Sequence, residues 1–446
     1  MLQKKGYAKL KQGVEHWNKW RDKNYTTRLN LENVNLSSEK LMGIDFRGVN
    51  LSGANLVKSN LSGANLDGAN LSYANLTRAN LTGASLIGTN LTGAILIESN
   101  YRNADLIGAN LNTANLSDAN LRIVNFSSAE LSNANFSQAN LDGAEFRGAN
   151  LTRANFHLAN LSNADLTDAE LTAARLEKAN LTKANLNQAS LVEANLSAAE
   201  CGLASFIRAD LQGANLSRAN LEQTDFSDAN LTSSDLQGAS LEKAIFADAE
   251  LYNADLSQAN LKDCNLRMAQ LVEVRALDTK FQGCNMTGAC IEGIKIDRRT
   301  SLSSVSCEYL YLERGRQKRF PEKHSQILSA SKFQELVEQI KGTLDLVFEV
   351  EVDWLTVLLA LQKLQNQYNS EEIYIREIRG LDAGGLIVKL FIPPHLDPEI
   401  FAQSFWHQYQ LILASKKKPT FDGSNSSQLF LRSLVSDRIQ PRVIGQ

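Results

Sequence analysis

The chain has 446 residues, a formal net charge of −3 and five cysteines. That charge excludes a polycationic nucleic-acid wrapper, and scattered cysteines behind an N-terminus without a secretory segment favour a reducing compartment over a disulfide framework. No apolar run approaches the roughly 18 residues that a membrane span needs, so no contact with a membrane is expected.

Charge is distributed unevenly along the chain. Residues 1–30 carry eight basic and two acidic side chains, residues 31–300 sum to −9, and residues 301–446 carry 17 of each sign. All six prolines lie beyond residue 320. These shifts predict three physically different segments.

The first segment, residues 1–28, is expected to be an N-terminal helical cap. The apolar residues that follow helical spacing in it are Leu10, Val14, Trp17 and Trp20. The basic face of this helix allows two interpretations, a contact with a membrane or nucleic acid, or a solvated face. We favour the solvated face, because charge runs on helices usually serve solubility.

Residues 29–298 form an uninterrupted five-residue repeat. From Leu31 to Ile296 every fifth residue is a repeat centre, mostly Leu and otherwise mainly Phe, without insertion or deletion. Ala stands two residues before most centres, and the residue between is mostly Asn or Asp. After the centre come Ser, Thr, Asp or Arg, and then often Gly. A repeat of this kind decides the fold of the segment that carries it.

A period of five suits neither an α-helix, whose period is 3.6, nor a flat strand, whose period is 2. It predicts a backbone that turns one corner per repeat, so that every centre points to a common axis. Four corners close a square coil, and stacked coils pair at the strand spacing of about 4.8 Å. Residues 20 apart then stack, which makes Phe206, Phe226 and Phe246 a ladder of core side chains.

The triplets 54–56 and 64–66, both Ala-Asn-Leu, and dozens like them resemble the pentapeptide-repeat family. The resemblance implies an all-β, right-handed quadrilateral β-helix, here of about 13 coils and roughly 65 Å long. Residues 13–21 resemble a leader found before cyanobacterial members of that family, and this resemblance suggests a cytoplasmic setting. We expect this leader to cover the open edge of the first coil, because unpaired edges invite aggregation.

The repeat ends at residue 298. We expect a connector at 299–324, a small α+β domain at 325–413, and a polar linker with a short docking helix within 414–446. The elements expected in the α+β domain are helices at 331–340, 352–367 and 398–413, and strands at 371–379 and 385–392. Residues 307–312 and 344–348 resemble a domain that trails many cyanobacterial pentapeptide-repeat proteins, and the resemblance implies no activity.

The sequence offers no legible catalytic or metal-ligating constellation. Cys264 and Cys284 stand 20 apart at inward positions and are interpreted as buried thiols, with a redox disulfide as the alternative. No zinc pattern and no phosphate-binding loop with the Gly-Lys-Ser/Thr ending occurs. We therefore expect no enzyme activity, no metal and no cofactor.

One side of the predicted coil is acidic. The centres 31, 51, 71 and onward to 291 collect eight acidic residues, against Arg153 alone, and we call this the acidic side. Six of these residues and a basic run further along make up the candidate interaction surface: Glu130, Glu170, Glu193, Asp210, Glu250, Glu273, Arg314, Arg316, Lys318 and Arg319.

These observations predict a non-enzymatic scaffold or adaptor that binds a protein partner through a rigid solenoid. Self-association through the C-terminal domain is part of this expectation, and direct binding of nucleic acid is not. The alternative is a DNA-mimicking inhibitor of gyrase or of another DNA-binding protein, which the resemblance allows. We favour the scaffold, because one acid per roughly 8 Å is sparse beside the charge per about 3.4 Å on each DNA strand.

Overall fold

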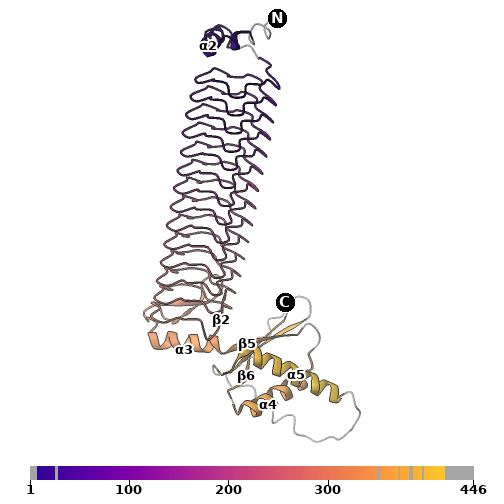
Figure 1. Cartoon of the computed structure of the whole chain (residues 1–446). Coiled ribbons are helices and arrows are strands. Elements are labelled where there is room, and N and C mark those ends of the chain that lie inside the picture. Colours follow the sequence, from indigo (N-terminus) through magenta and orange to yellow (C-terminus); the bar gives the residue numbers. More distant parts are fainter. Residues whose placement is uncertain are drawn as a thin grey trace. The chain divides into compact units, whose positions relative to one another are not determined.

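The computed structural model describes residues 8–25, 29–348, 352–370, 372–380, 385–393 and 396–416. The chain divides into two compact units between Leu328 and Ser329. The first unit contains the repeats as a stack of coils, and the second contains most of the helices (Figure 1). Within the described ranges, no helix combines the length and apolar character needed to cross a membrane.

Each repeat of the first unit is a β-turn followed by one bridging residue. In the repeat centred on Leu56, the amide of Ser59 donates to the carbonyl of Leu56 at 3.1 Å, and the intervening Lys58 has a φ of 57°. Glycine adopts such a positive φ at the lowest cost, as Gly63 does with a φ of 61°. This requirement explains why Gly so often stands two residues after a centre.

Successive coils pair in parallel at a shift of 20 residues. Asn50 bridges Asn30 in one direction and Asn70 in the other. The side chains pair too, because Nδ2 of Asn70 donates to Oδ1 of Asn50 at 3.0 Å. Oδ1 of Asn70 in turn accepts from the amide of Ser72 at 3.1 Å. Each such Asn therefore closes its own turn and joins the neighbouring coil, which explains the preference for Asn before the centre.

The repeat centres and the small residues before them fill the axis of the stack. Leu66 and Ala64, for example, are both buried. Phe206, Phe226 and Phe246 stack with ring centroids 5.0 Å apart. The predicted ladder of core side chains is thus confirmed.

The stack continues past the last repeat of the sequence pattern. Lys280 bridges Ser301, a shift of 21 residues instead of 20. The extra residue is accommodated at Asp297, whose carboxylate accepts a hydrogen bond from the amide of Thr300 at 2.9 Å. Part of the segment 299–324, expected to be a connector, therefore belongs to the stack. A one-residue insertion moves this part out of the strict period of five, so the sequence pattern does not predict it.

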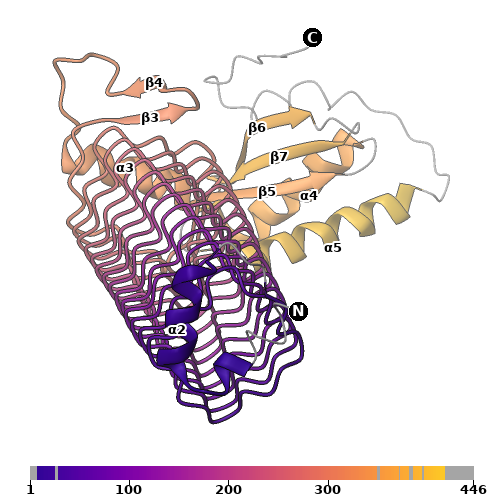
Figure 2. The ribbon, with the colours of Figure 1, turned by 90° about the horizontal axis from the view of Figure 1, so that it is seen from above.

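Short strands mark the end of the stack. They are β1 (Arg275–Ala276) and β2 (Lys295–Ile296), which pair in parallel, and β3 (Leu310–Glu313) and β4 (Gln317–Phe320), which pair as an antiparallel hairpin. β3 begins on the coil edge, where Tyr311 bridges Cys290. The hairpin then leaves the coil and runs beside it (Figure 2).

The N-terminal helix α2 (Val14–Lys23) lies against the first coils. Nε1 of Trp17 donates to the carbonyl of Asp45 at 2.7 Å, and the Trp17 side chain is fully buried. The guanidinium of Arg21 is also buried and lies 3.9 Å from the carboxylate of Asp45. Gly13, with a φ of 101°, separates α2 from a helical turn before it. The helix expected to begin before Gly13 is therefore interrupted there.

The second unit is an α+β structure with a three-stranded antiparallel sheet in the order β5-β7-β6. Its elements are α3 (Ala330–Lys341), β5 (Thr343–Phe348), α4 (Trp354–Tyr368), β6 (Tyr374–Gly380), β7 (Leu386–Phe391) and α5 (Pro398–Lys416). Leu346 of β5, Val357 of α4 and Phe405 of α5 share one hydrophobic core.

Three helices and two strands of the second unit lie close to their expected positions. Strand β5 was not expected, because it follows the C-terminus of α3 directly, with only Gly342 between them. The docking helix and most of the linker expected within 414–446 lie outside the described residues, which end at 416.

Candidate functional site

Four residues of the acidic side form one vertical column on the stack. Through their backbone bridges, Glu130, Glu170, Asp210 and Glu250 alternate with neutral residues of the coils between them. The carboxylates therefore recur at every second coil, about 9.6 Å apart. We call these four residues the carboxylate column.

Two members of the carboxylate column also take part in the hydrogen bonds between coils. Nδ2 of Asn150 donates to Oε2 of Glu130, and Nδ2 of Asn230 donates to Oδ1 of Asp210, both at 2.9 Å. These two carboxylates replace the Asn that usually stands at their positions and keep the acceptor of the ladder, whereas Glu170 accepts from the amide of Thr172 in its own turn at 3.3 Å. The column thus adds negative charge without breaking the stack.

Glu193 and Glu273 occupy a different position of the repeat. Both are the third residue of their turns, with φ of 57° and 55°. Glu193 is exposed, and Glu273 is half-buried and forms an ion pair with Lys295 at 3.6 Å. They lie on the same side as the carboxylate column but do not continue it.

The hairpin brings the basic run to the acidic side, at Tyr252 and Glu292, and to the neighbouring side, at Asp248. A guanidinium nitrogen of Arg316 lies 3.0 Å from Oδ1 of Asp248. The guanidinium carbon of Arg314 lies 5.1 Å from the ring centroid of Tyr252, and the backbone amide of Arg314 donates to the carboxylate of Glu292. Two surfaces that the sequence suggested separately are therefore in contact.

The other two basic residues are engaged within the hairpin and its neighbours. Lys318 forms an ion pair with Glu313 at 3.2 Å. Arg319 lies over the ring of Tyr309, 4.3 Å from its centroid, and donates to the carbonyl of Lys323 at 3.0 Å. Sequence reasoning missed Asp248 and Tyr252, because neither stands out before the hairpin is placed beside them.

Comparison with family models supports the assignment of the first unit. A model described as pentapeptide repeats matches in eight copies, at residues 44–83, 59–97, 84–122, 129–168, 169–200, 204–242, 224–263 and 259–295. These matches cover more than half of the chain. The chain belongs to the pentapeptide-repeat family. Its stack of coils is accordingly a right-handed quadrilateral β-helix.

Solved structures of other pentapeptide-repeat proteins resemble this chain. HetL from the cyanobacterium Nostoc sp. strain PCC 7120, involved in heterocyst differentiation regulation, is 30% identical over 56% of this chain and 95% of its own, with a TM-score of 0.28. QnrB1, a plasmid-mediated fluoroquinolone resistance protein, is 18% identical over 51% and 90%, with a TM-score of 0.21. Rfr23 from the cyanobacterium Cyanothece 51142 is 25% identical over 29% and 89%, with a TM-score of 0.14. A comparison with curated proteins finds no match.

The thiols of this pentapeptide-repeat protein lie in or beside its β-helix and are free. Sγ of Cys264 donates to the carbonyl of Leu241 and Sγ of Cys284 to that of Leu261, each at 2.9 Å. Burial raises the pKa of Cys264 above its usual range and that of Cys307 to about 12. The protonated thiol is a poor nucleophile and metal ligand. Among the described residues, no group of three or more His, Cys, Asp or Glu is arranged to hold a metal ion.

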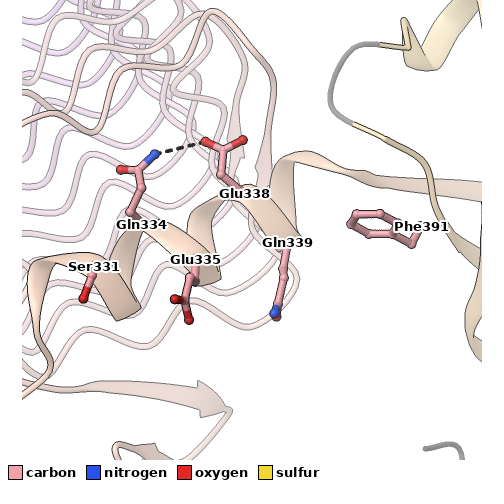
Figure 3. A pocket seen from close by; sticks show the side chains of 6 residues that line it. All are labelled: Ser331, Gln334, Glu335, Glu338, Gln339 and Phe391. Atoms are coloured by element: carbon pink, nitrogen blue, oxygen red, sulfur yellow. Dashed lines mark hydrogen bonds between the residues drawn. The ribbon is translucent and has the colours of Figure 1, made fainter. Parts of the chain in front are cut away.

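A shallow pocket lies in the second unit between α3 and the end of β7 (Figure 3). Its lining residues are Ser331, Gln334, Glu335, Glu338, Gln339 and Phe391. Nε2 of Gln334 donates to Oε1 of Glu338 at 3.0 Å, so part of the polar lining is paired within the helix. The hydroxyl of Ser331 pairs with that of Ser329 at 3.1 Å and with neither carboxylate of the lining, which leaves the acidic side and the hairpin as the better candidate.

Proposed function

We propose that the protein is a non-enzymatic scaffold whose β-helix, of about 13 coils and covered by α2 at its N-terminal end, binds a protein partner. The observation that carries this proposal is the carboxylate column, which repeats at a fixed interval on a rigid surface. Regular stacking holds the carboxylates in place before any partner arrives, so binding does not have to order them. Charge of one sign on such a surface favours a partner of the opposite sign.

The partner is expected to be a basic protein that the carboxylate column recognises in the cytoplasm. The test compares the wild-type chain with a variant in which the column is neutralised by Glu130→Gln, Glu170→Gln, Asp210→Asn and Glu250→Gln. The amides keep the shape and the acceptor oxygens of the ladder. Affinity capture from a cell lysate, with quantitative mass spectrometry, should recover the partner with the wild type only.

A matched control neutralises four carboxylates on other sides of the same β-helix: Glu145, Glu200, Glu222 and Glu242, each changed to Gln. It removes the same charge and leaves the column intact. Equal loss of the partner in the control and in the column variant would mean that net charge, and not the carboxylate column, determines binding. Equal recovery by all three chains would contradict recognition through the acidic side.

A DNA-mimicking inhibitor of gyrase is the weaker alternative. Carboxylates about 9.6 Å apart reproduce neither the spacing nor the density of phosphates, which recur every 3.4 Å or so on each DNA strand. A supercoiling assay with purified gyrase decides between the two. Inhibition at micromolar protein that disappears in the column variant would favour the mimic over the scaffold.

The second unit supplies a further contact in this proposal, self-association of the chain. The three strands of its sheet have two edges, β5 and β6, that no other described strand pairs with, and open edges favour pairing with another chain. Sedimentation velocity over a range of concentrations tests this part. A single monomeric species at the highest concentration would exclude it.

A further inference from the structure

We propose that the hairpin of residues 310–320 is an intramolecular ligand of the acidic side, which an arginine-bearing segment of a partner protein displaces. This inference rests on the proposed function, because it concerns the same surface. It adds the chemistry of the partner and a means of regulation. Two features of the molecule support it, the contacts that hold the hairpin and the surface beneath it.

The hairpin is attached to the coil firmly at its base. Tyr311 of β3 bridges Cys290, and the amide of Ile291 donates to the carbonyl of Tyr311 at 3.0 Å. β4 pairs with β3 and with no other described strand. The base is therefore part of the β-helix, whereas the rest of the hairpin depends on other contacts.

The tip, residues 313–318, is exposed; the side chains of Arg314 and Arg316 hold it, together with the bond from the amide of Arg314 to the carboxylate of Glu292. The ion pair of Arg316 with Asp248 has both side chains about half exposed, 50% and 47%. Exposed ion pairs and cation–π contacts are individually weak, and salt weakens ion pairs further. The tip can therefore open while the base stays in place.

The surface beneath the hairpin carries an aromatic and an apolar residue in two successive coils. The residue directly after the centre on this side is polar in all earlier coils except one, which carries Val192, and it is Tyr252 and then Val272 near the hairpin. Val272 is only 7% exposed, although it occupies an outward position. The β-helix thus carries a local apolar and aromatic patch where the hairpin lies.

The contacts of the tip indicate which ligand this patch accepts. The planar guanidinium of Arg314 lies over the ring of Tyr252, and that of Arg316 forms an ion pair with the carboxylate of Asp248. A planar guanidinium stacks on aromatic rings better than the compact ammonium of lysine does. A partner segment with the pattern Arg-x-Arg would offer the same two groups and could continue along the acidic side to Glu250.

The first experiment measures opening of the tip without any partner. Amide hydrogen exchange is compared between the wild type and the variant Arg314→Ala/Arg316→Ala. We expect faster exchange at the tip and unchanged exchange in the coils. Unchanged exchange at the tip would overturn the proposal, because the two arginines would then not hold the hairpin.

The second experiment measures access to the patch with a fluorescein-labelled nona-arginine peptide, read by fluorescence anisotropy. If the tip is closed about 90% of the time, removing its arginines should raise the apparent affinity about tenfold. Adding Asp248→Asn and Tyr252→Ala to that variant should cancel the gain. A nona-lysine peptide should gain less, because it cannot stack on Tyr252 in the same way.

The matched control is Arg208→Ala/Arg218→Ala, which removes two positive charges elsewhere on the β-helix. Arg208 pairs with Asp228, in the same column of the stack as Asp248, at 3.6 Å. An equal gain in affinity for this control would overturn the proposal in favour of net charge. Equal peptide affinity of the wild type and the tip variant would also overturn it.

The outcomes also separate this inference from the proposed function. Peptide binding that depends on the carboxylate column but not on the tip arginines would leave the proposed function standing and overturn the intramolecular ligand. Peptide binding that depends on neither the carboxylate column nor the tip arginines would overturn both the proposed function and the intramolecular ligand. Thermal unfolding of every variant confirms that the β-helix is folded, and the single variant Arg316→Ala serves if the double variant is not.

Discussion

The guanidinium of Arg316 lies 3.0 Å from the carboxylate of Asp248, 68 residues earlier in the chain. This contact joins a basic run that follows the repeats to the acidic late coils of the β-helix. The surface charge of that end is therefore partly balanced within the chain. A partner that binds there has to compete with the chain's own arginines.

The Asn ladder is expected to contribute to the stability of the β-helix. Asn70→Ala would remove the bond from Asn70 to Asn50, and the bonds that Asn70 accepts from Asn90 and from the amide of Ser72. Each is a partly solvated bond, so we expect a loss of about 1–2 kcal/mol in the free energy of unfolding.

Thermal and denaturant unfolding measure the effect of Asn70→Ala. The control is Ser72→Ala, which changes a side chain of the same turn but keeps the backbone amide that donates to Asn70. It should change the free energy of unfolding by less than about 0.5 kcal/mol. Equal losses in both variants would show that the turn, and not the ladder, determines the effect.

The hydroxyl of Tyr101 is a polar atom without a hydrogen-bond partner in the core of the β-helix. Tyr101 replaces the usual Leu at a centre, it is fully buried, and its hydroxyl makes no hydrogen bond in the structure. Burial alone raises the pKa of Tyr101. An unpaired buried hydroxyl costs about 1–3 kcal/mol, so Tyr101→Phe should raise the midpoint of thermal unfolding.

Calorimetry checks the prediction for Tyr101. Tyr101→Leu, which restores the consensus centre, is the comparison, and it should gain less because it leaves space where the ring was. A lower unfolding midpoint for Tyr101→Phe would mean that the hydroxyl is bonded to a water molecule inside the coil.

The period of five made the β-helix and its core predictable, because each repeat imposes the same turn and the same inward positions. The positive φ at residues such as Lys58 also follows from the frequent Gly at that position of other repeats. The hairpin was not predictable in this way. Its tip depends on Arg314 and Arg316 meeting Tyr252 and Asp248, and no local pattern connects residues so far apart in the sequence.

The contact between α2 and the first coils is expected to weaken in acid. Burial of Asp45 disfavours its charge, but hydrogen bonds from Arg47 and the nearby guanidinium of Arg21 outweigh this and hold the pKa of Asp45 below its usual value of 3.8. A depressed folded pKa gives stability that is complete above the unfolded pKa and is lost as the pH falls through the folded one. Protection of the α2 amides from hydrogen exchange, corrected for intrinsic rates, should therefore fall below about pH 4.

The variant Asp45→Asn tests this assignment. It should lose the protection of the α2 amides already at neutral pH and show a flatter pH dependence, because it leaves the buried Arg21 without its carboxylate. The control Asp105→Asn should change neither the protection at neutral pH nor its pH dependence. Protection that falls with the same pH profile in Asp45→Asn as in the wild type would assign the titration to another group.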